Sequence, residues 1–377
     1  QPGCEDACLA AEQLTVPFKL HDYHRATAIT FLALPLSLWA DHQYRSMPFI
    51  SAKPVKHESP SLSIIVPARD EEENLRTLLP SLKSIDFKGA YEIIVVDDNS
   101  SDQTASIAEA YGVKVIRLPD PSPGCLGKPN ACHQGALMAQ GDWLLFTDAD
   151  TIHTQQGPVS ALTHAIENQL DGLSLFIKQD CKGVLDRLAL TIAFAGLFAG
   201  RDPRQKTLNG QYILLRRDVY MQSGGFAAVC NQPMEDLALG DRLNQLGYHV
   251  PMMIGEQCAS VRMYRNTNQL WHGLIRLGSG TVRWSGIWSL LTITLITALM
   301  SPLVVLSGVL FGQLHPRWLP LTWLATTLSA LPWAKRYGNK QHAILAPIGA
   351  LFVQIAAVYG ILTRLFKQKQ QWKGRRV

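Results

Sequence analysis

The sequence predicts an α/β domain, with a mostly parallel sheet sandwiched by helices, that is followed by C-terminal transmembrane helices. Short apolar segments alternate with amphipathic ones between residues 62 and 150, as expected for a parallel sheet covered on both faces. Long uncharged segments follow residue 284. The charges are divided as well, since all 30 acidic residues lie before residue 257, whereas 14 Lys and Arg lie after residue 256. A polar module attached to a basic, apolar anchor explains this division.

We expect three regions: an N-terminal membrane-associated segment (1–60), an α/β domain (61–270) and a membrane region with two to three apolar segments and a basic tail (271–377).

The composition, 47% apolar and 17% charged, excludes a disordered chain. The seven scattered cysteines include no C-x-x-C pair, so neither zinc nor a disulfide framework is indicated. The basic residues lie beside apolar segments, which argues against a nucleic-acid partner.

The elements of the α/β domain are expected in a regular order. The first strand is Leu62–Val66, and Asp70 is predicted to cap the helix that carries the apolar face Leu75, Leu78, Leu79 and Leu82. The further strands are Tyr91–Val96, Val113–Leu118 and Trp143–Thr147, and the helices between them are about Thr104–Tyr111 and Asn130–Gln140.

Carboxylates follow two of these strands. Asp97 and Asp98 end the second strand, and Asp148 and Asp150 end the fourth. Ligands bind beyond the carboxyl ends of parallel strands, so these side chains should meet in one crevice. Clustered carboxylates repel one another unless a cation joins them, and oxygen ligands favour Mg²⁺ or Mn²⁺ bound to a diphosphate. The alternative is that they are ordinary solvated turn residues.

Five segments make the chain resemble the inverting glycosyltransferases of family 2, which have the GT-A nucleotide-sugar-binding fold. The segments are SIIVPARDEEENL (63–75), EIIVVDDNSSDQT (92–104), GKPNACHQGALMAQGDWLLFTDAD (127–150), NGQYILLRRDVYMQSGGF (209–226) and MEDLALGDRLNQLGY (234–248). The resemblance implies an enzyme that binds a UDP- or GDP-sugar together with Mg²⁺ or Mn²⁺.

The resemblance also implies a role for individual residues. Those expected to bind the nucleotide sugar are Pro67, Ala68, Glu72, Asp97, Asp98, Lys128 and Asp148, and those expected at the metal are Asp148 and Asp150. The turn Gly224, Gly225 and Phe226 is expected to shape the sugar and acceptor site. Asp236 is expected to be the general base, with Glu235 beside it. Without the resemblance, an acidic pair favoured by the helix dipole would also explain Glu235 and Asp236.

One motif departs from the family pattern. Processive polysaccharide synthases carry Gln-x-x-Arg-Trp before their membrane helices, and Arg283 and Trp284 occupy that place here, but Gly280 replaces the Gln. This departure puts polymer synthesis in doubt. Arg283 and Trp284 are expected either at the acceptor and diphosphate site or as an interfacial anchor.

Four apolar stretches are candidate membrane segments. Residues 285–312 and 343–363 are long enough to span, residues 318–333 could span or re-enter, and residues 26–40 are short for a span. The catalytic domain is expected in the cytoplasm. The basic residues near 335–340 and those of the C-terminal tail both favour the cytoplasmic side, although they flank a single apparent span.

The acceptor is expected to be lipid-soluble and to offer a hydroxyl group. Residues 184–199 are strongly apolar inside the catalytic region, which indicates either an interfacial helix or a core helix. Residues 111–150 are similar to carotenoid and carotenoic-acid glycosyltransferases, among them the myxol 2′-O-glycosyltransferases. The resemblance leaves open a glycolipid acceptor (ceramide, sterol or diacylglycerol), a polyprenyl phosphate, and a non-catalytic scaffold that binds nucleotide sugars.

Overall fold

The computed structural model describes residues 19–53, 60–119, 127–202, 207–232, 234–337, 340–365, 371–372 and 375–376. The side chains of residues 278–285 and of those after 363 lie outside the description. The chain divides into two compact units. The helical unit comprises Gln1–His42, Gly183–Gly200 and Ile287–Ile355, and the α/β unit comprises Gln43–Lys182, Arg201–Gly286 and Ala356–Val377.

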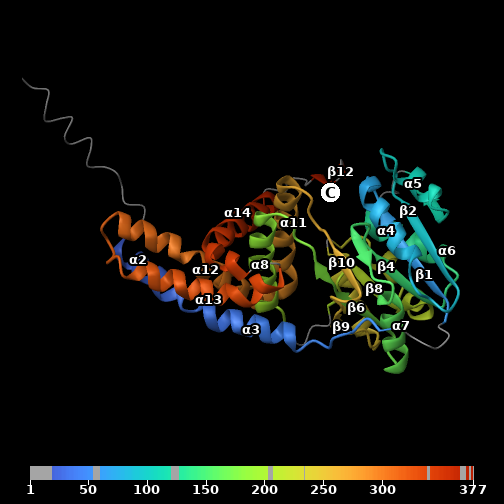
Figure 1. Ribbon diagram of the computed structural model, residues 1–377, viewed down its shortest axis with the longest axis horizontal. Coiled ribbons are helices and arrows are strands. Elements are labelled where there is room, and N and C mark those ends of the chain that lie inside the picture. The colour runs from blue at the N-terminus through green and yellow to red at the C-terminus, as the bar shows by residue number, and fades with distance from the viewer. Residues whose placement is uncertain are drawn as a thin grey trace, which may run out of the picture. The chain divides into compact units, whose positions relative to one another are not determined.

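A seven-stranded sheet forms the centre of the α/β unit, with the strand order β3-β2-β1-β4-β8-β6-β9 (Figure 1). The strands are β1 (Leu62–Ala68), β2 (Tyr91–Asp97), β3 (Lys114–Arg117), β4 (Trp143–Thr147), β6 (Gly172–Phe176), β8 (Tyr212–Arg216) and β9 (Met252–Ile254). Only β8 runs antiparallel to its neighbours, β4 and β6. The predicted α/β fold with a mostly parallel sheet is confirmed. Because β1 pairs in parallel with both β2 and β4, the carboxyl ends of these three strands lie at the same edge of the sheet.

A second, three-stranded sheet joins segments that are distant in the sequence. Its strands are β5 (Thr151–His153), β7 (Lys178–Gln179) and β10 (Ala259–Val261), with β10 in the middle. Strand β5 begins directly after the Asp148-Ala149-Asp150 turn, so this small sheet holds the far side of that turn.

Helices cover both faces of the main sheet. They are α4 (Glu72–Lys83), α5 (Thr104–Ala110), α6 (Gly127–Met138), α7 (Gly157–Glu167), α9 (Arg217–Gln222) and α10 (Glu235–Gln245), with the 3₁₀ turn η1 (Gly225–Val229). Helix α11 (Thr267–Ser285) follows β10 in the sequence. Successive residues of a strand point to opposite faces, so Ile64 and Val66 enter one core and Ile65 the other. The leucines predicted on one face of α4 are buried in the first of these cores.

The expected cap of α4 is wrong by one residue. Glu71, not Asp70, is the N-cap, and its side chain makes no capping hydrogen bond. Asp70 has a φ of 50°, and its Oδ1 accepts hydrogen bonds from the backbone N–H and the hydroxyl of Ser101. The carboxylate that was expected to cap its own helix therefore joins two loops instead.

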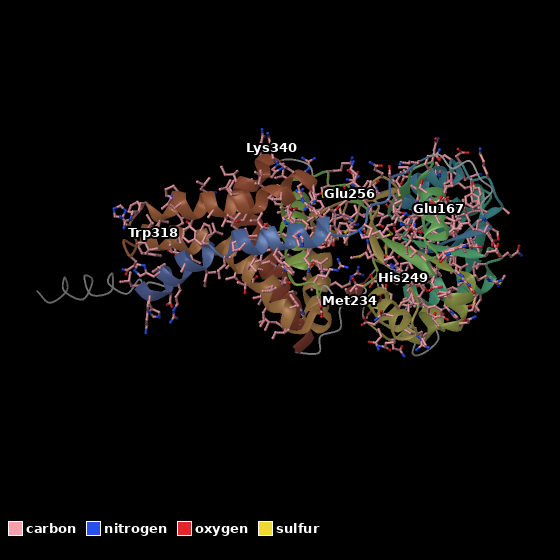
Figure 2. All side chains as sticks on the ribbon, turned by 90° about the horizontal axis from the view of Figure 1, so that it is seen from below. Glu167, Met234, His249, Glu256, Trp318 and Lys340 are labelled. Atoms are coloured by element: carbon pink, nitrogen blue, oxygen red, sulfur yellow. The ribbon has the colours of Figure 1, made fainter. Side chains whose placement is uncertain are left out.

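The helical unit contains α2 (Leu20–Thr30), α8 (Val184–Ala199), η2 (Gly286–Trp288), α12 (Ser289–Leu310), α13 (Trp318–Arg336) and η3 (Lys340–Leu345), together with most of α3 (Ala33–Arg45) and the first half of α14 (Ala346–Leu365). Trp318 and Lys340 lie near opposite ends of α13 (Figure 2). The apolar stretch 26–40 is divided between α2 and α3 by a turn at Phe31 and Leu32.

Among the described residues, two helices are long and apolar enough to cross a membrane, Gly286–Leu310 and Lys340–Thr363. They correspond to the two longest segments expected from the sequence.

Helix α8, which the sequence places inside the catalytic region, belongs to the helical unit. Almost all of its side chains from Leu188 to Ala199 are buried, and Gly196 lies against Ile296 of α12. A helix that is apolar all round and buried all round is a core helix, so the structure favours this alternative over an interfacial one.

Candidate active site

The loops that follow β1 and β2 are hydrogen-bonded to each other. Asp98 N donates to the carbonyl of Ala68, 2.8 Å away, and Arg69 Nη1 donates to the carbonyl of Asp98, 2.7 Å away. Glu72 Oε2 accepts from the backbone N–H of Gln103 at 3.1 Å. Asp70 and Asn99 both adopt a positive φ, which is uncommon for residues other than glycine. These contacts hold the two loops rigidly side by side.

Four of the predicted nucleotide-binding residues lie at this pair of loops. Pro67 and Ala68 end β1, and Asp97 and Asp98 are almost fully buried where β2 ends. Asp97 accepts hydrogen bonds from both the backbone N–H and the hydroxyl of Ser100, so its carboxylate shapes the turn. The structure thus brings these predicted residues to one place and gives Asp97 a structural partner.

A buried histidine, His153, lies next to the Asp148-Ala149-Asp150 turn and supports it. The sequence analysis did not single out this residue. Thr147 Oγ1 donates to the carbonyl of Gln211, and Thr151 Oγ1 donates to the carbonyl of Asp148. Both hydroxyl protons are therefore used, so His153 Nε2 must donate to the two threonine oxygens, at 3.0 and 3.3 Å. Burial lowers the pKa of His153 to about 3, which keeps the ring neutral.

Lys128 is the centre of a charged network at the end of β4. Its Nζ lies 2.6 Å from Asp148 Oδ1 and 3.8 Å from Glu235 Oε1. Burial disfavours the charged lysine, but the carboxylates of Asp148 and Glu235 outweigh this effect and raise the pKa of Lys128. The structure therefore joins three predicted site residues that come from α6, the turn after β4, and α10.

Asp236 is held in place by backbone groups. Its Oδ2 accepts from the N–H of Gly210 at 2.9 Å, and its Oδ1 accepts from the N–H of Leu237. A Cβ at Gly210 would lie 3.0 Å from Asp236 Oδ2 and 3.3 Å from Lys128 Nζ, so a glycine permits this close approach. Burial raises the pKa of the neighbouring Glu235, and the charge of Asp236 adds to the effect, whereas Lys128 opposes it.

The residues of the Asp148-Ala149-Asp150 turn fit a divalent cation. Burial, with added repulsion from Asp148 and Glu71, raises the pKa of Asp150 to about 8. Asp150 Oδ1 is buried and has no hydrogen-bond partner in the described structure, which is costly for a carboxylate oxygen. Mg²⁺ and Mn²⁺ need only one or two protein carboxylates when phosphate oxygens and water complete the shell. Among the described residues, no group of three or more His, Cys, Asp or Glu side chains is arranged to hold a metal.

Helix α11 and the segment just before it add two groups that the sequence analysis missed. Tyr264, just before the helix, packs on Gly273, where a Cβ would approach its ring to 2.3 Å. Burial raises the pKa of Tyr264 to about 12, and the charge of Asp150 contributes. The positive charge of the Arg276 guanidinium acts in the opposite direction and lowers the pKa of both Tyr264 and Glu235. Tyr264 and Arg276 both lie outside the five family segments, so no motif in the sequence pointed to them.

The remaining predicted residues are placed differently. Phe226 is buried in the core, with its ring centroid 5.2 Å from that of Phe146, and Gly224 and Gly225 form a tight turn above Tyr220. An interaction of this turn with a sugar would therefore come from its backbone rather than from the Phe226 ring. Arg283 and Trp284 lie on the last turns of α11, and their side chains are outside the described part of the chain.

Comparisons with known proteins agree with this fold. Residues 63–229 match the family model described as glycosyl transferase family 2. The chain is 24% identical to the 4,4'-diaponeurosporenoate glycosyltransferase of Staphylococcus aureus over 347 residues, which are 86% of this chain and 90% of that protein. It is also similar in structure to a mannosyltransferase from Pyrobaculum calidifontis, solved in complex with GDP-Man and Mn²⁺. That match has a TM-score of 0.56 and 16% identity, and it covers 93% of this chain and all of the other.

The structural match supports the fold, and the family match adds the chemistry of the domain. The protein is therefore a glycosyltransferase with the GT-A fold, and its residues 63–229 match the family 2 glycosyltransferase model.

Proposed function

We propose that this protein is a membrane-bound, inverting enzyme that transfers a single sugar from a nucleotide-diphosphate sugar to a lipid-soluble acceptor of the carotenoid class. The observation that carries the proposal is the extent of the similarity to the S. aureus carotenoid enzyme. It covers 86% of this chain, whereas the family 2 model matches only residues 63–229. The similarity therefore includes helices beyond the donor-binding domain, where a lipid acceptor would bind.

The donor site is assigned to the edge of the sheet where β1, β2 and β4 end. The paired loops at Ala68 and Asp98 would enclose the nucleoside, and Lys128 would lie beside the diphosphate. Asp148 and Asp150 would hold Mg²⁺ or Mn²⁺. The metal, when bound, would supply positive charge to the leaving diphosphate. Both UDP- and GDP-sugars remain candidates for the donor.

Asp236 is assigned as the general base. Direct displacement at the anomeric carbon requires a group that accepts the proton of the acceptor hydroxyl. Hydrogen bonds from Gly210 N and Leu237 N fix the orientation of the Asp236 carboxylate. Lys128, which is already paired with Asp148, would keep positive charge near the leaving group throughout the reaction.

The dependence of sugar transfer on Asp236 should distinguish a hydroxyl acceptor from a carboxylate acceptor. The name of the S. aureus relative denotes a carboxylate acceptor, which is already ionised at neutral pH and has no proton to lose. A hydroxyl acceptor, such as that of a xanthophyll, requires the base. Transfer to a hydroxyl would therefore depend on Asp236 far more strongly than transfer to a carboxylate.

The proposal is tested with membranes that contain the full chain, Mn²⁺ and a panel of radiolabelled UDP- and GDP-sugars. The acceptors are a hydroxylated carotenoid, a carotenoid carboxylate, ceramide, a sterol, diacylglycerol and a polyprenyl phosphate. We expect one sugar to be transferred to a carotenoid. Transfer only to one of the other lipids would overturn the carotenoid assignment, and nucleotide binding without any transfer would support a scaffold.

The cellular role is tested by the pigment profile of a strain that lacks the gene. Accumulation of a carotenoid without its sugar is the expected result. Unchanged carotenoids would contradict the proposal. The predicted cytoplasmic position of the catalytic domain is part of the proposal, since nucleotide sugars are made in the cytoplasm.

A further inference from the structure

The helical unit contains three helical segments that run along one another from end to end. At one end, Tyr23 of α2 packs against Val305 of α12 and Leu314, with Trp318 of α13 beside them. In the middle, Thr30 of α2 is hydrogen-bonded to Ser301 of α12. The α2–α3 segment and α12 therefore extend past each other, and α13 begins at the end where α12 finishes.

The opposite end of this bundle is equally well defined. Asp41 of α3 is 2.6 Å from the guanidinium of Arg336 at the last turn of α13, and both side chains are nearly buried. Ser37 of α3 donates to the carbonyl of Ser329, so α3 and α13 stay together over several turns. The first turns of α12 lie at this same end of the bundle. Gly200 at the end of α8 lies against Thr292 of α12, and the neighbouring Ala199 accepts a hydrogen bond at its carbonyl from Trp39 of α3.

Helices α12 and α13 therefore have the same extent. With 22 and 19 residues, they are about 33 and 28 Å long, close to the roughly 30 Å hydrocarbon core of a bilayer. If α12 crosses the membrane, α13 crosses it too, because the two are tied to common neighbours at both ends. Hydropathy alone does not select α13 among the described helices, because its prolines, threonines and tryptophans make it less apolar than the two candidate spans.

Helix α14 does not follow this bundle. In the helical unit, its Gly349 rests on Leu188 and Ile192 of the core helix α8. In the α/β unit, its Gly360 rests on the backbone of Ile275 in α11, and Tyr359 packs against Trp271. Its second half is thus part of the same compact unit as the site residues. Helix α11 directly precedes η2 and α12 in the sequence, so it marks the side of the membrane from which α12 starts. A helix that ends against α11 therefore ends on that same side.

The exposed face of α14 and its flanks suit a bilayer surface. The helix and the preceding turn expose one stripe of large apolar side chains, which are Ile344, Ile348, Leu351, Ile355, Val358 and Leu362. Lys335 and Lys340 precede the stripe, and six Lys and Arg follow residue 363 in the sequence. An apolar stripe with basic residues at both ends matches the acyl boundary and the anionic headgroups of one leaflet.

We propose that α12 and α13 form the membrane-crossing hairpin, whereas α14 lies along the surface of the membrane with its apolar stripe in the headgroup region. The occupant of the stripe is the lipid bilayer. This arrangement removes the conflict in the charge pattern, because the basic residues at 335–340 and those of the tail then lie on one side. The proposal rests on the membrane attachment proposed above.

The test is cysteine labelling from one side of sealed vesicles with a membrane-impermeant maleimide. Single cysteines are placed at Gln313 between α12 and α13, at Lys340, and at Lys373 in the tail, and Ser106→Cys on α5 marks the side of the catalytic domain. The wild-type chain, with its own cysteines, measures the background. We expect Lys340→Cys and Lys373→Cys to be labelled together with Ser106→Cys, and Gln313→Cys only from the opposite side.

Each other result has a defined meaning. Labelling of Lys340→Cys and Lys373→Cys from opposite sides would overturn the proposal, because α14 would then cross. Labelling of Gln313→Cys and Lys340→Cys from the same side would overturn the assignment of α13. Release of the whole protein from membranes by alkaline carbonate would contradict the membrane attachment itself, which separates that failure from the others.

The depth of the helices gives a second readout. A fluorophore is attached at Ile344, Leu351 or Leu362 on the stripe of α14, and at Leu324 in the middle of α13, which is also exposed. Quenchers carried at shallow and deep positions of the lipid chains then report the depth. We expect shallow quenching at all three α14 positions and deep quenching at Leu324. Deep quenching at Leu351 with shallow quenching at Ile344 and Leu362 would overturn the proposal.

Discussion

Lys128 Nζ lies 2.6 Å from Asp148 Oδ1, and the same ammonium group is 3.8 Å from Glu235. One cation thus joins the donor side of the site, at the end of β4, to the acidic pair at the start of α10. The three residues are separated by 20 and 87 positions in the sequence. The charge of Lys128 should accordingly matter for both donor binding and transfer.

Replacement of Lys128 by methionine keeps the length of the side chain but removes its charge. We expect transfer to fall by about 10²-fold or more, because a preorganised positive charge beside the leaving diphosphate is lost. Nucleotide binding should weaken as well, which titration calorimetry measures in the presence of Mn²⁺. Lys114→Met is the matched control, since Lys114 forms a looser pair with Glu92, at 3.9 Å. Equal activities of the two variants would argue against the role of Lys128.

Asp236→Asn keeps the shape of the side chain but removes the base. For a hydroxyl acceptor we expect transfer to fall by about 10²- to 10⁴-fold, with nucleotide binding retained. Initial rates with hydroxyl and carboxyl acceptors are measured side by side, and Glu235→Gln serves as the control. Full activity of Asp236→Asn with a hydroxyl acceptor would remove Asp236 from the mechanism.

The buried imidazole of His153 should make stability dependent on pH. The unfolded chain binds a proton on this residue near pH 6.5, whereas in the folded protein its pKa is about 3. Between these values the unfolded state holds more protons, so the free energy of unfolding should decrease as the pH falls from 6.5 toward 3. The loss should be on the order of a few kcal/mol.

The measurement is the unfolding midpoint of His153→Gln and of the detergent-solubilised wild type across this range. We expect the variant to be less stable at neutral pH but to lose less stability in acid. His249→Gln is the control, because the His249 side chain is exposed. An identical pH dependence in His153→Gln and the wild type would show that this residue does not carry the effect.

Two glycines with positive φ allow the free-energy cost of backbone strain to be distinguished from the cost of crowding by a neighbouring side chain. At Gly225, with a φ of 49°, a Cβ would lie 2.2 Å from the ring of Tyr220. At Gly247, with a φ of 85°, a Cβ would meet nothing within 4 Å. We expect Gly247→Ala to cost about 1–2 kcal/mol of unfolding free energy from the backbone alone. Gly225→Ala should cost clearly more, as denaturant unfolding will measure, and equal costs would contradict the crowding at Tyr220.

The Asp41–Arg336 pair should stabilise the helical unit. Breaking a buried ion pair by removing one partner costs about 3–5 kcal/mol, because the other charge is left buried. We expect Asp41→Asn and Arg336→Met each to lower the unfolding midpoint, and the double variant to be less damaged than the sum of the two. A double-mutant cycle measures this coupling. Additive effects would indicate that the two side chains act independently.

The local pattern of residues was enough to predict much of the fold and part of the site. Short runs rich in β-branched residues, such as Leu62–Val66 and Tyr91–Val96, favour buried strands, and both were found with nearly the expected bounds. Carboxylates directly after such strands must lie at the carboxyl edge of a parallel sheet, which is where Asp98 and Asp148 are. These inferences succeed because strand period and strand direction are encoded over a few neighbouring residues.

Contacts between distant segments were decided by the tertiary structure alone. The neutral state of His153 depends on its burial, with the ring of Tyr212 against it, and the effect of the Arg276 charge on the pKa of Glu235 depends on how α11 returns to the site. Asp70 looked like a helix cap, yet Ser101 of another loop takes its carboxylate. Long apolar segments looked alike in the sequence, but their neighbours differ. Packing energy depends on which surfaces meet, and that information is not present in any single segment.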